Sequence, residues 1–84
     1  MYEGNWVDDQ KHGEGEQTEA DGTKYIGEFK AGMRNGFGIL LTCDGALFEG
    51  EWLNDKKQGY GVLQRADNEV EEGVWEDDIL VESI

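Results

Sequence analysis

The hydrophobic positions of this chain follow a two-residue alternation of aromatic residues and glycine. Near the N-terminus, Tyr2, Gly4 and Trp6 occupy alternate positions, with polar residues between them. Side chains two positions apart on a β-strand point to the same face, so this spacing places both rings and the glycine on one face. The glycine leaves a gap between the rings that a ring from a neighbouring strand can enter. The pattern therefore predicts a β-strand with one aromatic face.

The same pattern recurs every 23 residues and divides the chain into repeats. Three units align without a gap, at residues 2–24, 25–47 and 48–70, and a degenerate partial unit covers 71–84. The units open on Tyr2, Tyr25 and Phe48, place a second aromatic at Trp6, Phe29, Trp52 and Trp75, continue with the glycine pairs Gly13 and Gly15, Gly36 and Gly38, and Gly59 and Gly61, and close with Asp21-Gly22, Asp44-Gly45 and Asp67-Asn68. Self-similarity of this kind indicates an architecture in which each unit packs on its neighbours.

Each unit is predicted to be a β-hairpin. The dipeptides Asp-Gly and Asp-Asn tolerate positive φ values, which tight connections between antiparallel strands require. The Gly-x-Gly strand offers a flat trough across which the neighbouring rings can lie. Hairpins joined edge to edge predict one all-β module over residues 1–84: a single-layer, elongated antiparallel sheet of about seven strands, on the order of 30–35 Å long.

The motif Tyr-x-Gly-x-Trp, followed seven residues later by Gly-x-Gly and then by Asp-Gly, resembles the MORN (membrane occupation and recognition nexus) repeat. The resemblance covers residues 2–75 and implies hairpins stacked into one twisted antiparallel sheet. It also implies an interaction or assembly module, as in radial-spoke heads and protist cytoskeletal proteins. The family name records a membrane role, in junctophilins and plant phosphatidylinositol phosphate kinases, and MORN repeats also occur beside catalytic domains such as a histone lysine methyltransferase.

The two ends of the chain depart from the pattern. Glu71 replaces the aromatic that opens the other units, and no Gly-x-Gly pair follows Trp75. We expect residues 77–84 to form a short C-terminal cap, as a strand or as a short helix, because a terminal repeat otherwise exposes an apolar flank and open backbone groups. Met1 leads directly into the first unit, so the first strand is expected either to continue a longer array or to pair with another strand.

The face opposite the glycines differs between the units. It carries Glu14, Glu16 and Thr18 in the first, Phe37, Ile39 and Leu41 in the second, and Tyr60, Val62 and Gln64 in the third. A single-layer sheet cannot bury both of its faces. Two interpretations stay open: the segment 79–81 folds over these apolar residues, or the residues form a partner or self-association surface, since exposed apolar patches often mark interaction sites.

Charge narrows the choice of partners. The net charge is −13, with 20 acidic and 7 basic residues and a pI near 4.1. Such a surface repels nucleic acid and anionic lipid headgroups, so nucleic acid is not a predicted partner and membrane lipid is disfavoured. Lys11, Arg34 and Lys56-Lys57 are expected in equivalent loops, where they would form a local basic edge. The single Cys43 and the lack of a signal peptide or a long apolar stretch favour a cytoplasmic protein, and association with the cytoskeleton or with a membrane stays open.

No residue pattern indicates catalysis. His12 occupies a repeat position that Asn35 and Gln58 hold in the next units, and nothing in its spacing brings it to Cys43. The glycine pairs lack the context of a phosphate-binding loop, and the acidic pairs, such as Asp8-Asp9, lack the spacing of a calcium loop. We therefore predict no enzyme, no metal site and no cofactor.

The sequence thus predicts a non-catalytic scaffold for protein–protein interaction or self-association. The predicted partner-binding residues are Tyr25, Phe29, Phe48 and Trp52 on the aromatic face, and Phe37, Ile39, Tyr60 and Val62 on the opposite face. Two alternatives remain open. One is a phospholipid-associating module, and the other is a regulatory accessory segment of a larger enzyme such as a phosphatidylinositol phosphate kinase.

Overall fold

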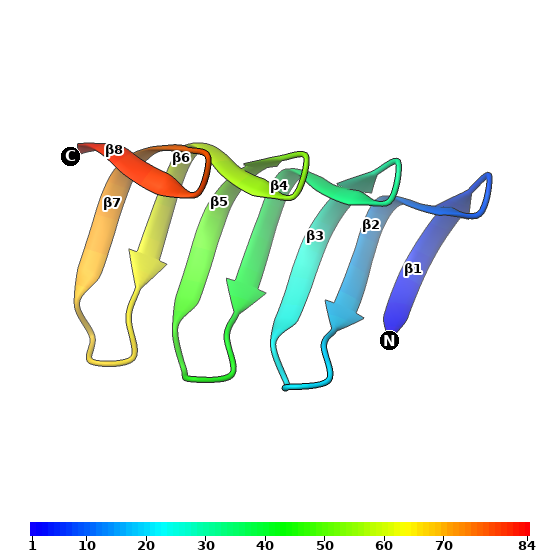
Figure 1. Ribbon diagram of the computed structural model, residues 1–84, viewed down its shortest axis with the longest axis horizontal. Helices are drawn as coiled ribbons and strands as arrows, with labels where there is room; N and C mark the ends of the chain where they lie inside the picture. Colours follow the sequence, from blue (N-terminus) through cyan, green and yellow to red (C-terminus); the bar gives the residue numbers. More distant parts are fainter.

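The computed structural model describes residues 1–84 and consists of one open antiparallel sheet (Figure 1). Eight strands lie in the sheet in the order in which they occur in the chain. Their bounds are β1 Tyr2–Val7, β2 Gln10–Thr18, β3 Lys24–Lys30, β4 Met33–Leu41, β5 Leu47–Leu53, β6 Lys56–Gln64, β7 Val70–Glu76 and β8 Ile79–Ser83. No helix is present, so the predicted all-β fold of stacked hairpins is confirmed. The molecule measures 39 Å along its longest axis.

Two kinds of connection alternate along the sheet and lie at opposite ends of the strands (Figure 1). Tight two-residue turns close each hairpin, and both residues of the turn have positive φ, as at Ala31 (52°) and Gly32 (82°). Two positive φ values are typical of type I′ turns, whose twist matches that of the paired strands. Longer loops join successive hairpins. In each loop the second residue of the predicted turn dipeptide has positive φ: Gly22, Gly45 and Asn68.

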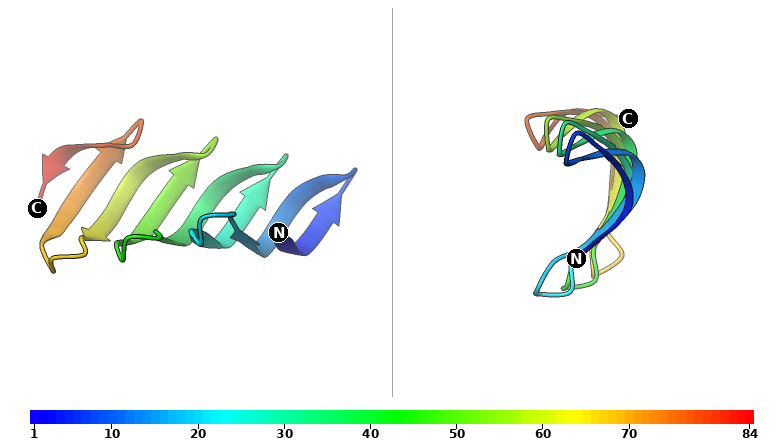
Figure 2. Two further views of the ribbon diagram at one scale, coloured as in Figure 1. Left: turned by 60° about the horizontal axis from the view of Figure 1, so that its bottom comes forward. Right: turned by 90° about the vertical axis from the view of Figure 1, so that its right-hand side faces the viewer.

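A row of glycines crosses the sheet from β1 to β7. Seven glycines pair directly on successive strands: Gly4, Gly15, Gly27, Gly38, Gly50, Gly61 and Gly73. A side chain at Gly38 would collide with the ring of Tyr25, and a Cβ at Gly27 would lie 2.5 Å from the Cα of Gly38. The strands are bent into a C-shaped cross-section with a concave and a convex face (Figure 2). The glycine row therefore leaves the inner side of the bend free for rings.

Beside the glycine row, the hairpins contain a bulge. In the second hairpin, Glu28 of β3 faces the three residues 35–37 of β4, and Gly36 in the middle of them has a φ of 100°. The carboxylate of Glu28 accepts a hydrogen bond at 2.6 Å from the backbone N–H of Phe37. This bond satisfies a donor that the bulge removes from the ladder. The first and third hairpins have equivalent shifts of register.

The core lies on the concave face and is a chain of aromatic rings. Seven rings meet edge to face, with centroids 4.9–5.4 Å apart, in the order Trp6, Tyr2, Phe29, Tyr25, Trp52, Phe48 and Trp75. The five from Phe29 to Trp75 are 1–4 % exposed. Trp52 donates its indole N–H to the carbonyl oxygen of Gly38 at 3.2 Å, and Trp75 donates to Gly61 at 3.0 Å. Because each of these indoles reaches the glycine strand of the preceding hairpin, the hairpins interlock.

The C-terminal segment forms the last strand of the sheet and does not cover either face. β8 pairs antiparallel with β7, and Leu80 faces Trp75 across this pair. The interpretation in which residues 79–81 fold over the convex face is therefore wrong. Of the two forms expected for a cap, the strand is the one observed. Leu80 packs against the aromatic core at the end where Glu71 replaces the next ring.

Candidate functional site

The residues predicted to bind a partner divide between the two faces. Tyr25, Phe29, Phe48 and Trp52 lie on the concave face, where they form the core. Their rings contact one another, so direct contact with a partner would require the module to open. A role of these four rings in partner binding stays a prediction, and the candidate surface described below does not include them.

The other four predicted residues lie on the convex face. Phe37 is 54 % exposed and Tyr60 is 46 % exposed, although both belong to regular strands. Strand pairing adds Ile26 beside Ile39, and Val74 beside Tyr60. We call the following six side chains the convex apolar residues: Ile26, Phe37, Ile39, Tyr60, Val62 and Val74. No other segment of the chain covers them.

Carboxylates separate the convex apolar residues into two groups. Glu49 and Glu51 of β5 stand between the group on β3 and β4 and the group on β6 and β7. Glu51 accepts a hydrogen bond at 2.8 Å from the backbone N–H of Tyr60. Glu72 of β7 accepts another from the hydroxyl of Tyr60, and this bond raises the pKa of the phenol because it stabilises the protonated form. The convex face thus alternates between apolar and acidic strips.

The convex face is hollowed over the first two hairpins. A depression of about 500 Å³ extends from β1 to β4. Three glycines of the glycine row lie at its base: Gly4, Gly15 and Gly27. Its side chains are Glu3, Glu14, Glu16, Ile26, Glu28 and Phe37. The first hairpin therefore contributes only carboxylate side chains to this hollow, and the second contributes two apolar side chains and the carboxylate of Glu28.

Three cations lie over the rings of the concave face. The guanidinium of Arg34 is 4.6 Å from the ring centroid of Trp52, and the ammonium groups of Lys11 and Lys57 lie 5.2–5.9 Å from their nearest rings. Such contacts are favourable because the face of an aromatic ring is negative. The expectation that Lys11, Arg34 and Lys56-Lys57 stand in loops is wrong, since these residues belong to β2, β4 and β6. Burial lowers the pKa of Lys57.

Acids of the tight turns contact two of these cationic residues. Asp55 accepts hydrogen bonds from Arg34, at 2.8 Å from its backbone nitrogen and at 3.2 Å from its Nε. Asp78 accepts one from the backbone N–H of Lys57 at 2.8 Å. Each carboxylate thereby ties a turn to the strand of the preceding hairpin. The turn carboxylates therefore help to hold Arg34 and Lys57 in position on the concave face.

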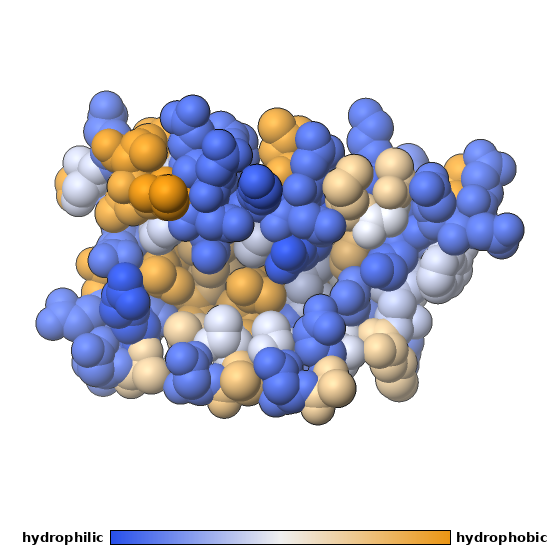
Figure 3. Space-filling model, in the orientation of Figure 1, coloured by the Kyte–Doolittle hydropathy of each residue, from blue (hydrophilic) through white to orange (hydrophobic).

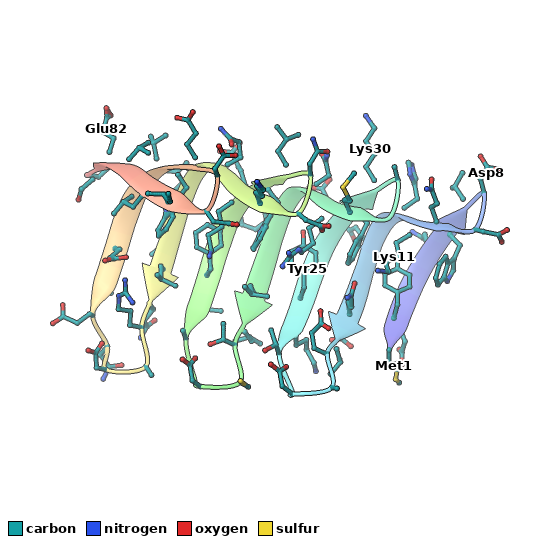
Figure 4. All side chains as sticks on the ribbon, viewed as in Figure 1. Met1, Asp8, Lys11, Tyr25, Lys30 and Glu82 are labelled. Atoms are coloured by element: carbon teal, nitrogen blue, oxygen red, sulfur yellow. The ribbon has the colours of Figure 1, made fainter.

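The concave face forms a groove with a partly apolar floor and a hydrophilic rim (Figure 3). Lys11 and Tyr25 lie inside this groove (Figure 4). Lys11 has Gly32 in place of a turn carboxylate, and a hollow of about 170 Å³ opens between Lys11 and Arg34. Tyr25 lines this hollow and donates its hydroxyl to the carbonyl oxygen of Glu28 at 2.9 Å. Burial raises the pKa of Tyr25 to about 12.

The repeat can also be compared with known families. The sequence model of the MORN repeat matches residues 2–24, 25–46 and 48–70. The chain belongs to the MORN repeat family. Each match covers one hairpin and the loop that follows it, so the aromatic core and the glycine row are features of consecutive MORN repeats. No curated protein matches the chain by sequence.

The MORN repeats do not bring the reactive side chains together. The thiol of Cys43 is exposed and lies 3.7 Å from a carboxylate oxygen of Asp21, and no hydrogen bond joins it to His12. No three His, Cys, Asp or Glu side chains are grouped as a metal site would require. No helix has the length and hydrophobicity needed to cross a membrane.

Two features of the MORN sheet escaped the sequence interpretation: the cations over the rings and the bulge carboxylates. The signal for the first is the pair of residues that closes each hairpin, such as Asp8-Asp9 and Asn54-Asp55, because Asp and Asn tolerate the positive φ of a tight turn. Recognising these turns places Lys11 and Lys57 inside strands. The signal for the second is the recurrence of a Glu between the glycine and the second aromatic of the second and third repeats.

Proposed function

We propose that this chain is a non-catalytic MORN scaffold that binds a protein partner on its convex face. One observation carries the proposal, namely that Phe37 and Tyr60 are about half exposed on a well-formed sheet. Exposed groups of large apolar side chains mark interaction sites, and aromatic residues are enriched in protein interfaces. The convex apolar residues are therefore the contact surface that we assign to the partner.

The architecture favours a rigid platform for such a contact. The chain has 56 backbone hydrogen bonds, most of them in one continuous ladder, and its aromatic core lies behind the convex face. A partner can therefore reach the convex apolar residues without disturbing the core. Interfaces of preformed surfaces of this kind usually need little movement of the backbone.

A membrane surface and a second copy of the convex face receive less support as occupants. The convex face carries carboxylates, while Lys11, Arg34 and Lys57 are drawn into the concave groove against the rings. Anionic headgroups would be repelled by the convex carboxylates, and each exposed base attracts them by only about 1 kcal/mol. Two convex faces brought together would place like charges opposite each other, which disfavours self-association through this face.

Site-specific photo-crosslinking tests the proposal. A photoreactive phenylalanine analogue at Phe37 should form an adduct with one protein in cells that express the chain naturally, and Tyr60→Ser should abolish this adduct. The same analogue at Ala20, an exposed residue of the β2–β3 loop, is the matched control and should not form it. Adducts with lipid alone, or the same adducts from both positions, would contradict the proposal.

A further inference from the structure

We propose, on the basis of the function proposed above, that the hollow of the convex face binds a short basic segment of the partner protein. This segment carries an apolar side chain directly after its basic residues. The hollow lies over β1 to β4 and has a volume of about 500 Å³, which is within the range of ligand-binding clefts.

The hollow follows the glycine row across the strands. Gly4, Gly15 and Gly27 alternate along their strands with the residues that point to the convex face, so a polypeptide lying between those side chains meets the backbone of the sheet at the glycines. Two rows of side chains flank these glycines: Glu3, Glu16 and Ile26 on one side, and Glu14, Glu28 and Phe37 on the other. From β1 to β4 the hollow spans three strand spacings, about 14 Å, which is the length of about four extended residues.

The charge of the hollow is negative, and half of its carboxylates are free. The side chains of Glu3 and Glu14 make no hydrogen bond or ion pair, and no Lys or Arg lines the hollow. Glu28 is bound to a backbone N–H. Glu16 has only Lys24, at 3.7 Å, and their side chains are 41 % and 40 % exposed. An ion pair this open to solvent is weak, so a basic residue of a partner can take its place.

The far end of the hollow carries two apolar side chains beside the hydrogen-bonded carboxylate of Glu28. Ile26 and Phe37 line it there, and both are more than 40 % exposed. A small cation would leave these two side chains in water, whereas a polypeptide with an apolar residue next to its bases covers them. Nucleic acid and anionic lipid would be repelled by the carboxylates. Shape, charge and hydrophobicity together therefore select a basic and amphipathic segment.

The arrangement gives the bound segment a direction along the sheet. Ile26 and Phe37 of the second repeat occupy the repeat positions that Glu3 and Glu14 occupy in the first. The basic residues of the segment consequently lie over β1 and β2, and its apolar residue lies over β3 and β4. No other pair of neighbouring hairpins combines these two sets of side chains at the same positions.

Fluorescence anisotropy with labelled synthetic peptides tests this inference. The main probe has the sequence Lys-Arg-Lys-Phe-Leu. Two reference peptides keep only its charges, Lys-Arg-Lys-Gly-Gly, or only its apolar end, Gln-Gln-Gln-Phe-Leu. We expect the main probe to bind at low salt, and each reference peptide to bind about tenfold more weakly, since each lacks one of the two sets of contacts.

Matched variants locate the binding. Glu3→Gln together with Glu14→Gln should weaken binding of the main probe about tenfold, because each substitution removes one exposed ion pair with the peptide. Asp8→Asn together with Asp77→Asn removes the same charge from two tight turns outside the hollow, where asparagine also accepts a positive φ. This control should change the affinity less than about twofold, as expected for distant, exposed charges in salt. Tryptophan fluorescence verifies that all variants are folded.

Several outcomes would overturn the inference. Equal binding of the main probe and the charge-only peptide would show that the affinity comes from the general negative charge, and so would an equal loss in the Asp8 and Asp77 control. Failure of every peptide to bind would overturn it as well. Light scattering and cosedimentation with phosphatidylserine vesicles run in parallel, and a dimer or vesicle binding that Phe37→Ser abolishes would assign the hollow to a second copy or to lipid.

The crosslinking experiment at Phe37 separates failure of this inference from failure of the proposed function. A single protein adduct without peptide binding would support the proposed scaffold function and overturn only the inference that the hollow binds a basic segment. Peptide binding that depends on Glu3 and Glu14, together with a protein adduct, would support both.

Discussion

On strand β3, Tyr25 and Phe29 are each 3 % exposed on the concave face, whereas Ile26 on the convex face of the same strand is 41 % exposed. Rings on the concave face meet in edge-to-face contacts from one repeat to the next. Side chains on the convex face contact only the side chains beside them on neighbouring strands. One side of each strand therefore stabilises the stack, while the other side is free to differ from repeat to repeat.

The charges divide between the faces in a similar way. Each complete repeat places one cation over the concave rings, and the convex hollow contains only carboxylates as charged groups. A partner that approaches the convex hollow therefore meets a negative surface.

The largest effect is expected from Trp52→Ala. Trp52 is 4 % exposed, contacts two rings and donates to the carbonyl of Gly38, so its removal leaves a cavity and an unpaired acceptor in the core. We expect the free energy of unfolding to fall by about 3–5 kcal/mol, measured by urea denaturation. A loss no greater than that caused by substituting Phe37 would break the division between the faces.

Gly38→Ala should have the second largest effect. We expect the free energy of unfolding to fall by about 2–3 kcal/mol, because the added methyl group would collide with the ring of Tyr25. The control is Gly45→Ala in the β4–β5 loop. Gly45 has a φ of 95° and no neighbour nearer than 3.7 Å to an added Cβ, so only backbone strain of about 1 kcal/mol is expected there. Equal losses in urea denaturation would show that the space inside the bend is not filled as described.

A smaller effect is expected from Trp6→Ala, although Trp6 occupies the same repeat position as Trp52. Trp6 is 55 % exposed and contacts only the ring of Tyr2, because no preceding glycine strand receives its indole. We expect a loss of about 1 kcal/mol in the same denaturation experiment, in proportion to the smaller apolar area it buries. A loss as large as that of Trp52→Ala would mean that the interlocking of repeats contributes little to stability.

The smallest effect on stability is expected from the convex face. Phe37→Ser combined with Tyr60→Ser should change the free energy of unfolding by about 0.5 kcal/mol or less per site, since both side chains are about half exposed. The same double variant should lose the partner adduct. Thermal unfolding followed by circular dichroism measures the first effect. If the free energy of unfolding fell at each site by as much as in Trp6→Ala, the convex apolar residues would be part of the core.

Much of the local structure was predictable from the alternation of residues. Tyr25 and Phe29 were placed on one face, and Phe37 and Ile39 on the opposite one, and the structure confirms both placements. This was possible because the direction of a side chain on a strand depends only on its position along that strand. The stacking of hairpins was predictable from the repeat period, because each unit of a repeat array contacts only its neighbours.

Other features depend on contacts between distant residues. Ala31 adopts a φ of 52° that alanine does not favour, because the pairing of β3 with β4 imposes the turn. Lys11 lies in a strand because that hairpin closes on Asp8-Asp9. The C-terminal segment, which the sequence left open between a strand and a helix, pairs with β7 because β7 offers an unpaired edge.

The sequence by itself determined the repeat, its hairpin character, the parity of every ring and the excess of acidic residues, because all of these are local or additive properties. The tertiary structure alone decided which face is buried. Curvature of the whole sheet closes the aromatic face around its own rings and leaves Phe37 and Tyr60 uncovered. A strand read in isolation cannot show the direction of that bend, because the bend arises from bulges and a glycine row that run across many strands.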